Sequence, residues 1–297
     1  MADRRQIERM RSGKGFIAAL DQSGGSTPKA LRLYGIDESM YSSEAQMFDL
    51  IHEMRTRIIT SPVFGGDRVL AAILFAQTMD RQVGGQATAT FLWREKTVVP
   101  FLKIDQGLAE VADGVQVMKP MAGLDDLLAR AVENEIFGTK ERSVIGAADR
   151  AGIVAVVEQQ FEVAERVRAH GLMPILEPEV TVTIPDKVEA EDILREVIVE
   201  HLDALPDGEE VMLKLSLPSV VDFYRPLIEH PRVLRVVALS GGLSREEADA
   251  LLAQNHSLIA SFSRALTEGF SVHQSDAEFD ATLDAAIQAI YDASTAD

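Results

Sequence analysis

One lysine in the chain has surroundings that could make it a nucleophile. Lys214 lies in the apolar segment VMLKLSLP (211–218), and Leu213, Leu215 and Leu217 occupy the opposite face of this predicted strand. A buried ammonium group is unfavourable unless it is paired or deprotonated. Burial and a neighbouring cation both favour the neutral amine, which can form a Schiff base with a carbonyl compound. From this segment alone, a structural lysine paired with a carboxylate is an equally good interpretation.

Other charged side chains lie in, or at the end of, apolar segments of strand length. They are Asp21 in GFIAALD, Lys103 and Asp105 in VVPFLKID, Glu177 and Glu179 in MPILEPEV, and Arg264 in LIASFSRA. Side chains alternate between the faces of a strand, so the two members of each close pair share a face. In a parallel barrel the carboxyl ends of the strands meet at one end, where the active site lies. We therefore expect these groups to gather around Lys214.

A glycine turn follows the seventh apolar segment and could bind a phosphate group. It consists of Ser240, Gly241 and Gly242, and a helix start is predicted at Ser244. Backbone N–H groups of the turn, together with the Arg264 guanidinium, would stabilise a dianion. The alternative is a plain connection between strand and helix.

A second glycine-containing segment lies near the N-terminus. In QSGGSTPK (22–29), the side chains of Ser23, Ser26 and Lys29 could hold another phosphate group. Taken as an isolated motif, the segment is equally typical of a flexible loop.

The apolar segments predict an α/β fold, a (β/α)8 TIM barrel. Eight segments are almost continuously apolar, as strands buried on both faces should be. They are residues 15–21, 69–76, 98–105, 142–148, 173–180, 211–218, 233–240 and 258–265. Helical patterns lie between them, at about 43–60, 125–137, 152–170 and 189–205, with capping-box pairs Ser43/Gln46 and Ser244/Glu247. Eight such units favour the closed barrel over a doubly wound open sheet. We expect a single domain over residues 1–297, with an N-terminal helix in 1–14 and a C-terminal helix and short tail in 276–297.

The amino-acid composition excludes several classes of function. The chain has 29 basic and 47 acidic residues and a net charge of −18, which argues against binding to nucleic acid or to an anionic membrane. It has no cysteine, which excludes thiolate catalysis and Cys-based metal sites and favours a cytoplasmic location. Its histidines form no metal-binding pair, so we expect no metal and no cofactor. The composition leaves the oligomeric state open between monomer and homodimer.

The chain resembles class I (Schiff-base) fructose-bisphosphate aldolases, most closely the shorter bacterial form of that family. The resemblance spans about residues 13–270 and consists of many motifs in the family's order. These motifs are GKGFIAALDQSGGS, ILFAQTM, FLKIDQG, GTKERSVI, ILEPEV, VMLKLSLP, LSGG and SRAL. The resemblance implies a (β/α)8 barrel, in agreement with the strand count.

The resemblance also implies catalytic roles by position. Lys214 matches the Schiff-base lysine. Glu177 matches the acid/base that serves carbinolamine formation and dehydration, with Glu179 beside it. Asp21 matches the carboxylate that takes the C4-hydroxyl proton, and Lys140 matches a cation near the Schiff base.

The remaining matches concern substrate binding. They are Lys103 with its neighbour Asp105, Arg142 in the Lys-x-Arg pattern, Ser240, Gly241, Gly242 and Arg264 at one phosphate site, and Ser23, Ser26 and Lys29 at the other. The chain departs from the animal enzymes at Gln22 and Ala30, where those enzymes carry an acidic and a basic residue. It also lacks the family's longer tail with a terminal tyrosine.

These observations lead to one hypothesis and two alternatives. The hypothesis is a metal-independent lyase of glycolysis that reversibly cleaves fructose 1,6-bisphosphate to dihydroxyacetone phosphate and glyceraldehyde 3-phosphate. The first alternative is a Schiff-base aldolase for another phosphorylated ketose, such as tagatose 1,6-bisphosphate. The second is a non-catalytic barrel scaffold.

Overall fold

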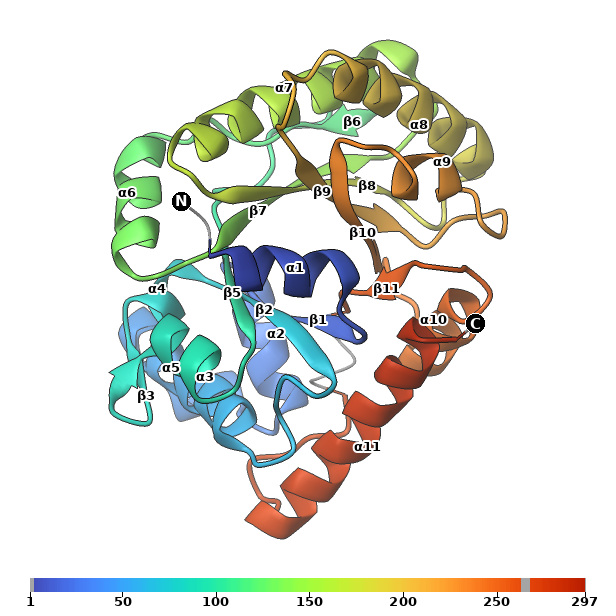
Figure 1. Ribbon diagram of the computed structural model, residues 1–297. Helices are drawn as coiled ribbons and strands as arrows, with labels where there is room; N and C mark the ends of the chain where they lie inside the picture. The colour runs from blue at the N-terminus through green and yellow to red at the C-terminus, as the bar shows by residue number, and fades with distance from the viewer. Residues whose placement is uncertain (1–2, 263–267, 297) are drawn as a thin grey trace.

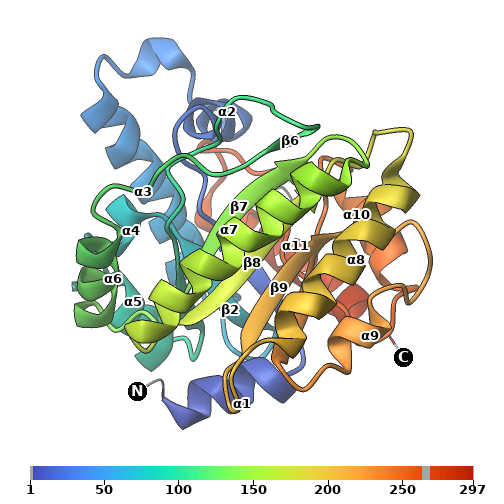
Figure 2. The ribbon, with the colours of Figure 1, turned by 90° about the horizontal axis from the view of Figure 1, so that it is seen from above.

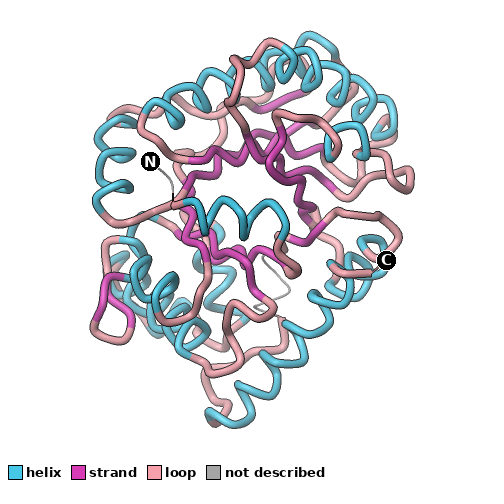
Figure 3. Tube along the Cα trace, in the orientation of Figure 1, coloured by secondary structure: helices cyan, strands magenta, loops and turns pink. Residues whose placement is uncertain are grey.

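Eight parallel strands form a ring surrounded by helices (Figure 1). The structure is a computed structural model and describes residues 3–262 and 268–296. The strands of the ring are β1 (Phe16–Leu20), β2 (Val69–Leu74), β5 (Val99–Lys103), β7 (Gly138–Ile145), β8 (Met173–Val180), β9 (Val211–Ser216), β10 (Val233–Leu239) and β11 (Ile259–Ala260). Each strand pairs in parallel with the next in this order. Because β11 lies beside β1, the ring is nearly closed (Figure 3), and the prediction of a (β/α)8 barrel is confirmed.

Helices connect the strands and cover the outside of the ring. The longer ones are α1 (Arg4–Ser12), α2 (Ser26–Leu33), α3 (Glu44–Thr60), α5 (Thr88–Arg94), α6 (Leu124–Glu133), α7 (Arg150–Ala169), α8 (Lys187–Asp203), α10 (Arg245–Leu252) and α11 (Asp276–Ser294). Short elements complete the connections: η1 (Glu38–Met40), α4 (Ala76–Met79), the hairpin of β3 (Gln82–Val83) and β4 (Gln86–Ala87), α9 (Arg225–Ile228), and β6 (Val115–Gln116), which is antiparallel to β7. None of the helices in the described part of the chain combines the length and apolar character that a bilayer crossing requires.

Several predicted boundaries differ from the structure. The strand predicted at 142–148 is β7, which begins four residues earlier at Gly138 because the polar run Thr139–Arg142 belongs to the strand. The helix predicted to reach residue 137 ends at Glu133, and Glu135 takes a positive φ of 60° that breaks the helix. The capping box is complete at Ser244, whereas at the start of α3 it is only partial. There, the Gln46 side chain accepts from the backbone of the preceding Ser42.

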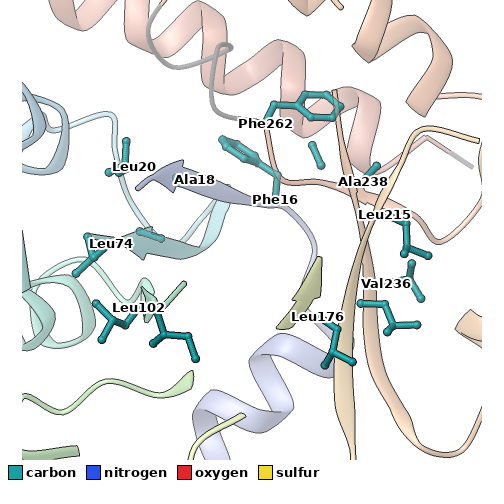
Figure 4. Packing of buried hydrophobic residues seen from close by; sticks show 14 of the residues in the cluster. Phe16, Ala18, Leu20, Leu74, Leu102, Leu176, Leu215, Val236, Ala238 and Phe262 are labelled. Atoms are coloured by element: carbon teal, nitrogen blue, oxygen red, sulfur yellow. The ribbon is translucent and has the colours of Figure 1, made fainter. Parts of the chain in front are cut away.

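Alternation along the strands divides the core into two layers. Outward-facing residues such as Phe16, Leu102 and Leu215 pack between the sheet and the helices (Figure 4). Inward-facing residues, among them Phe101 and Met212, form a second apolar cluster inside the ring. The strands of the ring are thus buried on both faces, as their nearly continuous apolar sequences require.

Helix α1 covers the amino-terminal end of the ring (Figures 1 and 2). Its Met10 packs into the inner apolar cluster and is fully buried. The Arg235 guanidinium donates to the carbonyls of Arg11 and Gly13, at 2.8 and 3.3 Å, and so caps the carboxyl end of α1. With this end filled by apolar side chains, the interior is open to polar chemistry only at the carboxyl ends of the strands.

Gly138 lets two strands and a phenyl ring approach closely. A Cβ atom at this position would lie 2.1 Å from the Met173 carbonyl oxygen and 2.6 Å from the Phe101 ring. The missing side chain leaves room for Phe101 in the inner cluster, directly below the next inward-facing residue of β7, Lys140.

Glu141 lies on the outer face of β7 and is fully buried. One carboxyl oxygen is 3.5 Å from the Thr139 hydroxyl, and the other has no hydrogen-bond partner among the described residues. Burial, followed by the charge of Asp105, raises the pKa of Glu141 well above its ordinary value. The Glu141 carboxyl group therefore keeps its proton to a higher pH in the folded protein than in the unfolded chain.

This proton predicts a pH-dependent stability difference between the wild type and the variant Glu141→Gln. A raised carboxyl pKa makes folding less favourable as the pH rises above the ordinary carboxyl range, and the amide side chain of the variant cannot titrate. Chemical denaturation from about pH 5 to pH 8 should show the variant gaining stability relative to the wild type with increasing pH. The exposed residue Glu165 on α7 provides the control, Glu165→Gln. A difference that is independent of pH for both variants would contradict a neutral Glu141.

Candidate functional site

A chain of four charged side chains crosses the interior of the ring above the inner apolar cluster. The Lys140 Nζ lies 2.7 Å from the Asp21 Oδ2 and 2.8 Å from the Glu177 Oε2. The other oxygen of the Glu177 carboxylate, Oε1, is 2.9 Å from the Lys214 Nζ. All four side chains are buried, and Lys214 is only 4% exposed. Two carboxylates and two lysines, from β7, β8, β9 and the segment after β1, thus form one connected cluster.

Strand alternation explains why these four residues meet. Glu177 follows the inner apolar residue Ile175 by two positions, and Lys214 follows Met212 in the same way. Inward-facing side chains of barrel strands stack in layers, so residues at equivalent heights share a layer. The charged cluster is therefore the layer directly above the apolar one.

The cluster fixes the charge of its members. Burial alone would raise the pKa of Asp21, but the nearby Lys140 and Lys214 outweigh it and lower the pKa. The same balance lowers the pKa of Glu177. Burial alone would lower the pKa of Lys140, yet Asp21 and Glu177 raise it above its ordinary value. At neutral pH the two carboxylates are ionised and Lys140 is a cation.

Two further ion pairs line the same cavity as this cluster. The Lys103 Nζ contacts the carboxylate of Asp105 at 2.7 Å and its carbonyl oxygen at 2.9 Å. The Arg142 Nε donates to the Glu179 Oε2 at 2.6 Å. Each pair joins a cation and a carboxylate, so the cations do not repel one another across the opening.

These side chains line a cavity of about 600 Å³, a size suited to a small-molecule ligand. Ser240, Gly241 and Gly242 form one part of its wall. Gly241 has a φ of 58°, and a Cβ atom there would lie 2.4 Å from Val182, so only glycine fits this turn. The eighth-strand residue predicted to complete this part, Arg264, lies outside the described residues.

Another part of the wall comes from the segment after β1. Ser23, Ser26 and Lys29 line the cavity at the start of α2. The Ser26 hydroxyl donates to the Ser23 carbonyl at 2.8 Å and accepts from the Ser23 N–H, which gives this turn a defined shape. The structure thus brings every predicted site residue that it describes to one cavity.

Sequence reasoning gave no site role to three polar residues at or behind this cavity. Gln22 and Ser261 line it, and the Ser261 hydroxyl is buried without a hydrogen-bond partner among the described residues. Arg55 lies behind the wall on α3 and is 1% exposed. Its position on the apolar stripe that contains Ile51 and Ile58 was a usable signal, because a charged residue on a buried helical face needs a partner.

The cavity is a suitable place for reactions of a carbonyl compound. A lysine amine lies beside a carboxylate that can exchange protons with it, and a fixed cation is close enough to stabilise developing negative charge. Across residues 3–262 and 268–296, no three His, Asp or Glu side chains are arranged to hold a metal ion.

Comparisons with known proteins agree on one family. Residues 5–221 match the family model "Fructose-bisphosphate aldolase class-I". The chain is 56% identical over 289 residues to the class 1 fructose-bisphosphate aldolase of Synechocystis sp., covering 97% of this chain and 96% of that protein. It is 54% identical over 292 residues to the protein of the same name from Porphyromonas gingivalis, covering 98% and 99%.

A solved structure extends the agreement to the fold. A fructose-bisphosphate aldolase from Plasmodium falciparum, crystallised with TRAP and a small-molecule inhibitor, superimposes with a TM-score of 0.76. The alignment covers 98% of this chain and 93% of that chain at 19% identity, so it bears on the fold alone. On the family model and the identity to full-length relatives, the chain belongs to the class I fructose-bisphosphate aldolases.

Proposed function

We propose that the protein reversibly cleaves fructose 1,6-bisphosphate to dihydroxyacetone phosphate and glyceraldehyde 3-phosphate through a Schiff base on Lys214. The observation that carries the proposal is the contact of the Lys214 Nζ with Glu177, 2.9 Å away at the base of the cavity. A lysine in this place can reach a bound carbonyl group while a proton acceptor stands beside it.

Schiff-base formation is the first chemical step. Lys214 first passes a proton to Glu177, and the neutral amine then attacks the C2 carbonyl carbon. The carbonyl oxygen takes up the proton that the attacking nitrogen loses, which gives a carbinolamine. Glu177 returns its proton to the new hydroxyl group, which leaves as water while the nitrogen lone pair forms the C=N bond. The product is a protonated imine that can accept an electron pair.

Carbon–carbon cleavage follows. Asp21, held ionised by Lys140, accepts the proton of the C4 hydroxyl group. The C3–C4 bond breaks, its electron pair moves into the imine, and the C4 carbon becomes the aldehyde of glyceraldehyde 3-phosphate. The enamine left on Lys214 then takes a proton at C3, and hydrolysis releases dihydroxyacetone phosphate and the free amine.

Two groups of residues would bind the phosphates. We assign one phosphate to the turn of Ser240, Gly241 and Gly242 with Arg264, and the other to Ser23, Ser26 and Lys29. Lys103 and Arg142, with their partners Asp105 and Glu179, would contact the sugar between them. Binding both ends of the substrate supplies energy that holds C2 against Lys214.

The substrate is thus a small phosphorylated sugar, and the site needs no metal or cofactor for this reaction. We also infer that residues 1–297 act as a single domain and that the protein works in the cytoplasm, where glycolytic intermediates occur.

Borohydride trapping tests the Schiff base directly. Reduction in the presence of dihydroxyacetone phosphate should attach the adduct to the peptide that contains Lys214, as seen by mass spectrometry. Lys214→Met should abolish the adduct and lower the cleavage rate by roughly 10³-fold or more. Lys96→Met is the matched control, because this lysine is partly buried outside the cavity and donates to the Ser61 carbonyl. An adduct at another lysine would refute the assignment.

Metal removal should leave the activity unchanged. The protonated imine on Lys214 accepts the electron pair that a Lewis acid would otherwise stabilise. Dialysis against EDTA should give the same cleavage rate as untreated enzyme. Lost activity that returns when a divalent metal is added would count against the proposed mechanism.

Comparison of two C4 epimers tests the substrate. Lys140 holds Asp21 on one side of the cavity, so the C4 hydroxyl group must point toward that side. We expect kcat/KM for fructose 1,6-bisphosphate to exceed that for tagatose 1,6-bisphosphate by about tenfold or more. A reversed preference would make the tagatose derivative the substrate, and inactivity toward both would favour a scaffold.

A further inference from the structure

Arg55 is a buried cation outside the cluster that carries out the chemistry. It is 1% exposed, and its side chain extends from α3 toward the segment after β1. The Nη1 donates to the Thr78 hydroxyl at 2.7 Å, and the Nη2 donates to the Gln22 carbonyl oxygen at 2.5 Å. One guanidinium therefore joins α3, α4 and the residue that follows Asp21.

Gln22 is also fixed from the other direction. Its side-chain amide donates to the Ala19 carbonyl at 3.2 Å. Asp21 thus lies between Ala19 and Gln22, which are tied to each other and, through Gln22, to Arg55. With its neighbours held in this way, the Asp21 carboxylate has little freedom to turn away from the cavity.

The charge of Arg55 also bears on Asp21. Burial lowers the pKa of Arg55 to about 10, and the negative charge of Asp21 acts in the opposite direction. Within the described residues, no carboxylate lies within ion-pair distance of the Arg55 guanidinium. A buried charge without a paired carboxylate contributes little to the stability of the fold. The more direct effect of Arg55 is to fix the positions of the groups that accept its hydrogen bonds.

We propose that Arg55 is a positioning residue, which holds the Asp21–Gln22 peptide so that the Asp21 carboxylate can accept the C4-hydroxyl proton. The inference rests on the proposed function, because it assumes that Asp21 acts in carbon–carbon cleavage. Arg55 itself contacts neither the reacting atoms nor Lys214. Its loss should therefore impair cleavage and spare Schiff-base formation.

The test measures these two reactions separately in Arg55→Met and Arg55→Lys. Borohydride trapping of dihydroxyacetone phosphate at Lys214 does not require Asp21 to act at C4, so its rate should stay within about twofold of the wild type. Cleavage of fructose 1,6-bisphosphate should fall roughly 10- to 100-fold in Arg55→Met, because small misplacements of a catalytic group have effects of this size. Arg55→Lys should recover part of the loss.

Arg57→Met is the matched control. Arg57 lies on the same helix and donates to the Tyr34 hydroxyl at 3.1 Å and the Gln274 carbonyl at 2.6 Å, away from Asp21. This variant should lose stability in thermal denaturation yet keep the wild-type ratio of cleavage to trapping. If Arg55→Met fails to fold, Thr78→Val removes one hydrogen bond of the same guanidinium and should shift the ratio in the same direction.

Two results would overturn the proposal. One is an equal loss of trapping and cleavage in the folded Arg55 variants, which would indicate a general structural role. The other is a cleavage rate that does not change. A wild-type enzyme that forms no adduct at Lys214 would instead refute the proposed function, so the two failures are distinguishable.

Discussion

The ion pairs of Lys140 organise the chemistry of this protein. Its ammonium group lies 2.7 Å from the Asp21 carboxylate and 2.8 Å from the Glu177 carboxylate, inside a ring whose layer below is apolar. Without this cation, two buried carboxylates would repel each other and take up protons. With it, both remain ionised, and Glu177 can also pair with Lys214. Lys140 thus holds Glu177 beside Lys214, the residue that we propose as the nucleophile.

The barrel limits the energetic cost of this arrangement. Charged groups occupy one layer of the interior, between the apolar cluster below and the open cavity above. Helix α1 and the inner apolar cluster fill the lower end, so the charges have one direction of access to solvent and substrate. The outer core between sheet and helices supports the ring without contributing to the site, apart from the positioning role that we propose for Arg55.

The fold can be predicted well from the apolar segments, because a strand that is buried on both faces consists of an almost unbroken run of apolar residues. Prediction is weaker where polar residues belong to a strand. The apolar pattern places the start of the strand that carries Lys140 at residue 142, because the polar run TKE (139–141) resembles a loop when the interior layer is unknown. The structure shows that this run is part of β7, with Lys140 and Arg142 facing inward.

The amino-acid sequence by itself determined the strand order, the inward face of Lys214 and the family to which the chain belongs, because alternation and motif order are local properties. It did not determine which charges meet. The pairing of Lys214 with Glu177, the bridging position of Lys140 and the hold of Arg55 on the residue after Asp21 were decided by the tertiary structure. Each contact joins segments that are far apart in the chain, and only closure of the ring brings them within hydrogen-bond distance.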